Sequence, residues 1–127
     1  MSIKKIITGL TLSLLLGTGV ASANWGDVYY CQMTNFIQVK PNGELTNYKL
    51  EKFQFKLDQT KNAMVFGDKG FFQNILYQLT TGKNFPEQEY WYASADFQSI
   101  FFDSGKLLIA STGSGGIISV SADCDKF

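Results

Sequence analysis

Histidine and arginine are both missing from the sequence, and each absence excludes a class of chemistry. The 127 residues contain no histidine, and all 11 basic residues are lysines. Without histidine the chain lacks the usual general base near neutral pH and the commonest metal ligand, and a Ser-His-Asp mechanism is excluded. Without arginine it lacks the bidentate donor for phosphate and carboxylate groups. We therefore expect a protein that is not an enzyme and that uses no metal and no cofactor.

The charge balance argues against nucleic acid as a partner. The chain carries 11 basic and 11 acidic residues, which gives no net charge at pH 7. Affinity for nucleic acid depends on an excess of basic charge. The expected partner is therefore an unknown protein or small molecule.

Residues 1–23 have the pattern of a secretory signal peptide. Two lysines precede a mainly apolar run, which ends in the small residues Ala21-Ser22-Ala23. The apolar run is shorter than the roughly 20 residues that a membrane-spanning helix needs. We therefore expect cleavage between Ala23 and Asn24, a periplasmic or extracellular location, and no stable membrane insertion of residues 24–127, which would form a single domain.

Only two cysteines, Cys31 and Cys124, occur in the chain. Exported proteins mature in an oxidising compartment, and two cysteines permit only one intramolecular pairing. Both also fall on the apolar side of their alternating segments. We expect a Cys31–Cys124 disulfide, with two free buried thiols or a bond between chains as the alternatives.

The chain after residue 23 has the pattern of strands separated by turns, because apolar and polar residues alternate in short segments. Residues 71–80 also fit the spacing of an amphipathic helix, but all their neighbours favour strands. We expect about seven strands: residues 28–39, 45–58, 63–66, 71–80, 89–102, 106–112 and 117–124.

Two of these segments carry assignments of side chains to faces. In the first, the apolar positions share the face of Cys31, but Asn35 interrupts them. Asn35 is consistent with a core amide that has backbone partners, a bulge, or a polar group inside a pocket. In residues 89–102, unbroken alternation places Phe97 and Phe101 on the same face as Trp91.

The predicted fold class is all-β. A single small antiparallel meander of about seven strands would curl into a barrel or flattened barrel, with its first and last strands joined by the disulfide. Closure of this kind also hides the edges of the sheet. The pattern leaves the choice between a barrel and a sandwich open.

Aromatic residues are the strongest compositional feature, with 11 Phe, 6 Tyr and 2 Trp. Several are adjacent in the sequence, and neighbours on a strand point to opposite faces. Tyr30, Phe36, Tyr90 and Tyr92 are therefore the candidates for an outward-facing surface that binds a ligand or partner. The alternative is ordinary packing with cross-strand aromatic pairs.

Acidic and glycine-rich segments give weaker signals. Asp123 and Asp125 flank Cys124 on one face, where we expect solvent rather than a cation. Asp96 is a lone carboxylate that would need a second acid nearby for catalysis. The segment Gly113-Ser114-Gly115-Gly116 has no GK[ST] ending and leads into a strand, which indicates a hairpin loop rather than a phosphate site.

The segment Tyr29-Tyr30-Cys31, together with the late Cys124, resembles in outline the small periplasmic inhibitors of c-type lysozyme. In that family a compact β-barrel is closed by a bridge between an early YxC-like segment and a late cysteine. The Ser-Gly-x-x-Tyr motif that carries inhibition in the family is absent from this sequence, so no site residue is transferred. Lipocalin-like barrels offer a second comparison in outline.

The features together predict an exported, non-enzymatic binding module. It would recognise a protein, an envelope component or a small ligand through its aromatic-rich face. The alternatives are a structural or assembly component of the cell envelope, and an inhibitor-type barrel similar in outline to the periplasmic lysozyme inhibitors.

Overall fold

The residues that the structure describes form strands, turns and loops, and no helix occurs among them. The computed structural model describes residues 23–80 and 90–127, so the predicted signal peptide lies, up to residue 22, outside the described residues. The strands are β1 (Val28–Val39), β2 (Leu45–Asn47), β3 (Lys52–Asp58), β4 (Ala63–Gly70), β5 (Leu76–Gln78), β6 (Trp91–Ala95), β7 (Gln98–Asp103), β8 (Lys106–Gly113) and β9 (Gly116–Lys126).

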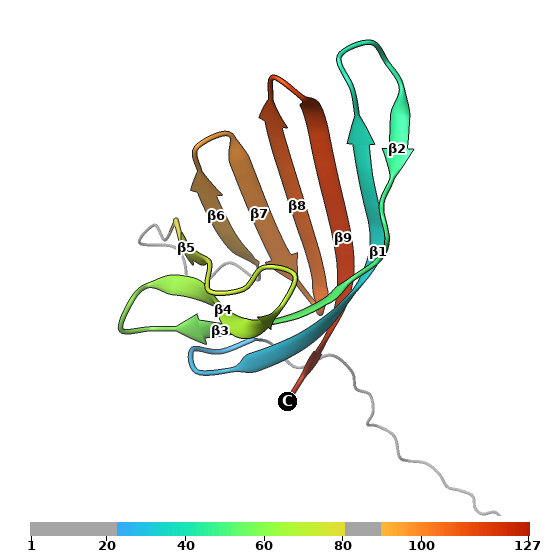
Figure 1. Ribbon diagram of the computed structural model, residues 1–127. Coiled ribbons are helices and arrows are strands. Elements are labelled where there is room, and N and C mark those ends of the chain that lie inside the picture. The colour runs from blue at the N-terminus through green and yellow to red at the C-terminus, as the bar shows by residue number, and fades with distance from the viewer. Residues whose placement is uncertain (1–22, 81–89) are drawn as a thin grey trace, which may run out of the picture.

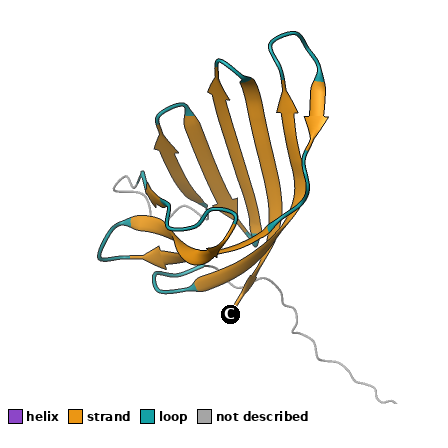
Figure 2. Ribbon diagram, in the orientation of Figure 1, coloured by secondary structure: helices purple, strands orange, loops and turns teal. Residues whose placement is uncertain are grey.

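The strands form one antiparallel sheet that curls into a nearly closed barrel (Figure 1). Its order is β5-β4-β3-β1-β9-β8-β7-β6, and β2 pairs with the end of β1 near Val39. The two ends of the sheet meet at a bridge between Leu79 and Ala93, where the amide of Thr80 donates to the carbonyl of Tyr92 at 2.8 Å. Figure 2 shows strands joined only by loops. The predicted antiparallel meander is confirmed, and the barrel is chosen over the sandwich.

The first and last strands lie side by side, as the cysteines predict. The ladder between β1 and β9 extends from the pair Tyr29–Lys126 to the pair Val39–Ile117. Within it Cys31 and Cys124 are directly opposite each other, with Cα atoms 4.0 Å apart, and they form the predicted disulfide. Both cysteines are buried, so the bond belongs to the core.

The core is built mainly from aromatic rings. Tyr29, Phe55 and Phe102 contact one another, with ring centroids 4.8 to 5.4 Å apart. Each buried ring of this size contributes about 1.5–3 kcal/mol through removal of apolar surface from water. The cluster continues through further buried aromatic side chains of β3, β4, the segment after β4, and β5: Phe53, Phe66, Phe72 and Tyr77.

A β-bulge in β1 changes which side chains face the core. The register with β9 shifts between Met33 and Asn35, so that Thr34 is an extra residue in the ladder. Beyond the shift, Phe36 lies opposite the buried Val120, while Asn35 and Ile37 lie opposite outward-facing serines. Asn35 is exposed and belongs to a bulge, the second of its three open interpretations. The sequence-based placement of Ile37 on the core face is wrong for the same reason.

Two predicted strands are each divided in two in the structure and a third is shortened, which gives nine strands rather than about seven. Residues 45–58 form β2 and β3, which pair with the two halves of the same edge of β1. Residues 71–80 contain turns followed by the short strand β5 rather than a helix. Residues 89–102 contain the hairpin of β6 and β7, because Asp96 and Phe97 form a two-residue turn between them.

Candidate binding site

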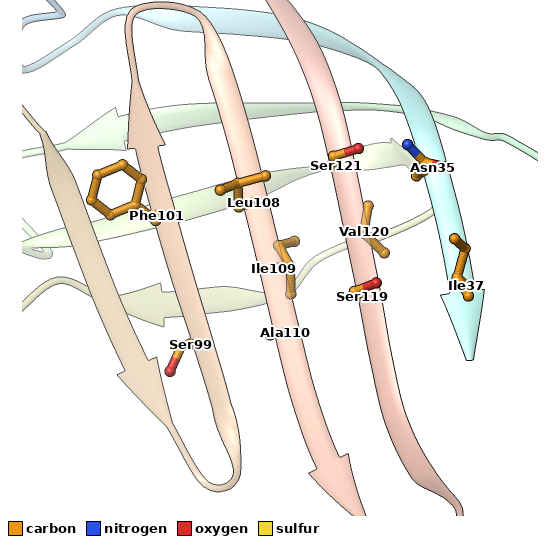
Figure 3. Close-up of a pocket in the computed structure, with 10 residues that line it drawn as sticks. All are labelled: Asn35, Ile37, Ser99, Phe101, Leu108, Ile109, Ala110, Ser119, Val120 and Ser121. Carbon is orange, nitrogen blue, oxygen red and sulfur yellow. The ribbon is translucent and has the colours of Figure 1, made fainter. Parts of the chain in front are cut away.

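A shallow hollow lies on the outer face of the sheet, over β7, β8, β9 and β1. Its volume is about 540 Å³. Figure 3 shows its lining side chains spread across these four strands. We call it the outer hollow, and its lining residues are Asn35, Ile37, Ser99, Phe101, Leu108, Ile109, Ala110, Ser119, Val120 and Ser121.

Strand pairing explains why the surface is depressed at this point. Ser99 lies opposite Ala110, and Ala110 lies opposite Ser119, so one row across three strands carries only small side chains. The next row along the strands carries the larger Phe101 and Leu108, which are themselves cross-strand neighbours. A row of small residues beside a row of large ones leaves a groove on the pleated surface.

The outer hollow carries no charge. None of its lining residues is acidic, basic or otherwise titratable, although 17% of the chain is charged. Leu108 is 51% exposed on this face, and the hydroxyls of Thr34 and Ser121 hydrogen-bond each other at 2.7 Å. The hollow is therefore suited to contact with an uncharged surface rather than to proton transfer.

An aromatic group borders the outer hollow on the side of β6. The ring of Tyr90 stacks on that of Phe101, with centroids 5.0 Å apart and an interplanar angle of 23°. Tyr92 is the cross-strand partner of Phe101, and its hydroxyl lies 3.4 Å from the hydroxyl of Ser99. We call Tyr90, Tyr92 and Phe101 the aromatic edge. It provides rigid rings with polar tips beside the hollow, a combination common in binding surfaces.

The four predicted aromatic candidates do not form one site. Tyr90 and Tyr92 lie together at the aromatic edge. Tyr30 is on the outer face near the disulfide, 46% exposed, with its ring against that of Phe127. Phe36 turns toward the core after the bulge and contacts the rings of Tyr48 and Phe71.

The acidic candidates stay apart from the outer hollow. Asp123 forms an ion pair of 2.6 Å with Lys106 on neighbouring strands, and both side chains are exposed. Asp96 is exposed at the tip of the β6–β7 hairpin. Within residues 23–80 and 90–127 there is no group of three or more His, Cys, Asp or Glu that could hold a metal ion.

The perturbed titrations also lie elsewhere. Burial raises the pKa of the Tyr29 phenol, and the nearby Asp27 carboxylate adds to this shift. Burial likewise raises the pKa of Tyr77, against which a hydrogen bond with Gln98 acts. At Asp58 a hydrogen bond from the Thr60 hydroxyl lowers the pKa of the carboxyl. None of these three groups lines the outer hollow, so their shifted pKa values bear on the stability of the fold and not on binding at the hollow.

Sequence reasoning missed Phe101 as an outward-facing residue. Unbroken alternation over residues 89–102 placed it with Trp91, but the two-residue turn at Asp96-Phe97 begins a new strand. Phe101 therefore pairs outward with Leu108, while Ile100 and Phe102 face the core. The single available signal was Asp96, since aspartate is frequent in tight hairpin turns.

Comparison with known proteins gave no match to a protein-family model and no significant match to a curated protein or a solved structure. The disulfide is compatible with an exported protein. Among the residues with a described position, no helix is long and apolar enough to cross a membrane.

Proposed function

We propose that this protein is an exported, non-enzymatic binding module that recognises a protein, an envelope component or a small ligand through the outer hollow. The observation that carries the proposal is the uncharged lining of the hollow beside the aromatic edge. Clustered exposed apolar side chains of this kind are typical of interaction surfaces. The signal-peptide pattern and the buried disulfide support export.

The contact area is built on rigid strands rather than on loops. Ala110 and Ser119 sit within continuous ladders on both sides, so the floor of the hollow keeps its shape without a partner. A partner therefore needs no ordering of the backbone at this site, which lowers the entropic cost of association.

The test is to fill the outer hollow with a larger side chain and to measure which bound components the protein then loses. Ala110→Lys places a long charged side chain on the exposed floor, and Gln78→Lys introduces the same charge at an exposed strand position of β5, away from the hollow. We would purify both variants and the wild type from the envelope fraction of the native host and compare them by native mass spectrometry and crosslinking in cells.

We expect Ala110→Lys to lose the bound component that the wild type and Gln78→Lys retain. Tyr90→Ala and Tyr92→Ala should weaken the same interaction, because they remove the aromatic edge. If Ala110→Lys keeps every interaction of the wild type while remaining folded, the outer hollow is not the binding surface.

A further inference from the structure

A second hollow lies at the end of the barrel that carries the β6–β7, β8–β9 and β1–β2 hairpins. Figure 1 shows β8, β9 and β1 extending beyond β3 and β4 at this end. The hollow has a volume of about 370 Å³ and is lined by inward-facing residues of these strands and by the hairpin tips. We call it the barrel mouth. It is on the opposite face of the sheet from the outer hollow.

The floor of the barrel mouth is a row of residues that crosses four strands. Gln98 is opposite Ser111, Ser111 is opposite Ile118, and Ile118 is opposite Gln38. All four are half-buried. The next inward-facing row toward the disulfide, which includes Ile109, is buried and apolar. The core therefore ends at a layer whose polar groups are mostly side-chain amides.

Gln38, one of the two glutamines of this row, is held in place by other hydrogen bonds. The Gln38 amide donates to the carbonyl of Gly115 at 2.7 Å and accepts from the hydroxyl of Tyr48. The Gln98 side chain lies near the buried phenol of Tyr77 and acts on its pKa. A primary amide has two N–H donors and two acceptor lone pairs, so the Gln38 amide keeps one of each beyond its two bonds. The Gln38 amide is thus oriented in advance and still able to bind a ligand.

Phe97 stands at the lip of the barrel mouth in a conformation that its side chain disfavours. Its φ is 59°, in the left-handed region that suits glycine or asparagine, and it is 77% exposed. Its carbonyl accepts a hydrogen bond from the amide of Thr112, which holds the turn against β8. A bulky side chain in this region adds strain, and an exposed ring gives little burial in return. The Phe97 ring therefore has no evident role in stabilising the fold, and a contact with a ligand would explain its position.

The chemistry of the barrel mouth matches an uncharged sugar. A pyranose ring has an apolar C–H face that stacks on an aromatic ring, and hydroxyls that pair with amides and other hydroxyls. The lining offers the Phe97 ring, the two glutamine amides and several hydroxyls, with Asp96 as its one charged side chain. With no basic residue in the lining, an anionic sugar or a phosphate group would lack a counter-charge.

We propose that the barrel mouth binds a neutral saccharide, a hexose or N-acetylhexosamine unit at the end of a glycan, with Phe97 stacking on the ring and Gln38 and Gln98 pairing with its hydroxyls. This site is separate from the outer hollow. It could be occupied whether or not the outer hollow has a partner.

The experiment is a titration of isotope-labelled protein with maltotriose and with tri-N-acetylchitotriose, up to about 10 mM, followed by NMR. We expect at least one of them to shift the side-chain amide signals of Gln38 and Gln98 and the backbone signals of Gly113–Gly116. An acidic trisaccharide and a neutral tripeptide are the comparison ligands, and neither should shift these signals.

Phe97→Gly separates the role of the ring from its effect on folding. Glycine relieves the backbone conformation, so the melting temperature should stay the same or rise, whereas saccharide affinity should fall roughly tenfold or more, equivalent to about 1.4 kcal/mol. Phe97→Trp should retain binding, and Ala110→Lys, which fills the outer hollow, should leave it unchanged.

Any of three results would overturn the proposal. The first is that neither saccharide shifts the signals of the barrel mouth. The second is that the shifts fall on Ser99, Ala110 and Ser119 instead. The third is that Phe97→Gly binds the saccharide as tightly as the wild type. Preferential binding of the acidic sugar or of the tripeptide would equally reject a neutral saccharide as the ligand. Loss of the partner of the outer hollow has no bearing on these readouts, so the two proposals can fail independently.

Discussion

Removal of the disulfide should cost this protein a large part of its stability. The change is the double substitution Cys31→Ala and Cys124→Ala, which keeps small apolar side chains in the buried space between β1 and β9. The bond joins residues 93 positions apart. For a loop of that length, chain-entropy arguments give a loss of about 4–5 kcal/mol. Domains of this size commonly have only about 5–15 kcal/mol in total.

Urea unfolding followed by tryptophan fluorescence measures this loss. Trp25 and Trp91 pack edge to face with ring centroids 4.9 Å apart, so their emission reports on packing of the first residue of β6 against the segment that precedes β1. With a slope of about 2 kcal/mol per molar urea, the midpoint should fall by roughly 2 M. The slope itself should increase, because the unfolded chain without the crosslink exposes more surface.

Wild-type protein under reducing conditions is the matched control, since it loses the crosslink but keeps both sulfur atoms. It should lose nearly as much stability as the double alanine variant. A midpoint shift below about 0.5 M in both would refute the entropic reasoning. It would mean that the unfolded chain already holds β1 near β9 without the bond.

Further predictions test the core, the hairpins and the bulge. Burial raises the pKa of Tyr77 above its ordinary value of 10.0. The folded state therefore favours the neutral phenol, and the stability of the protein should fall as pH rises through the folded pKa. Tyr77→Phe should reduce this loss of stability at alkaline pH, as measured by circular dichroism. Gly116 and Gly43 both have positive φ, but only at Gly116 would a Cβ collide with a neighbour, the carbonyl of Val39; Gly116→Ala should cost at least about 1 kcal/mol more than Gly43→Ala in urea unfolding. Deleting Thr34 removes the bulge without changing which residues face the core, so this variant should remain folded in proton NMR spectra, whereas deletion of Gln32 should unfold the protein.

The barrel and its closing bond could be predicted because several signals agreed. Cys31 and Cys124 fell on the apolar sides of their strands, and the signal-peptide pattern predicted an oxidising compartment. The first of these signals depends on the two-residue period of a strand, which is robust over segments as regular as β9. The second is independent of that period. Agreement between independent levels of this kind is what makes a sequence specify one fold.

The β6–β7 hairpin was not predicted, and the bulge was only one of three open interpretations of Asn35; both features change the candidate site. A bulge changes the alternation by one residue, so Asn35 looked like an exception on the core face instead of the start of a new register. The hairpin was hidden because its left-handed position holds Phe97, where glycine or asparagine would have marked a turn. The positions of Phe36 and Phe101 were assigned to the wrong faces for these two reasons.

The hidden hairpin is also informative about function. Residues that depart from the backbone and burial preferences of their type are most often found where the side chain has a role outside the fold. A strained, exposed aromatic residue at a tight turn departs from both preferences. Phe97 is one of four non-glycine residues with positive φ among those described, and the other three are two asparagines and a serine. The asparagines are expected in this region, and serine is small. Phe97 alone combines the unfavourable conformation with a large ring in solvent.

The two proposed sites use opposite faces of the same strands, so consecutive residues belong to different sites. On β8, Ala110 lies in the floor of the outer hollow and Ser111 in the floor of the barrel mouth. On β9 the same holds for Ser119 and Ile118. This part of the sheet extends past the buried core, so its inner face is available to a ligand instead of being occupied by packing. Substitutions at neighbouring positions therefore test different surfaces on an unchanged backbone, and Ala110→Lys and Ser111→Ala are adjacent changes that each affect only one of the two faces.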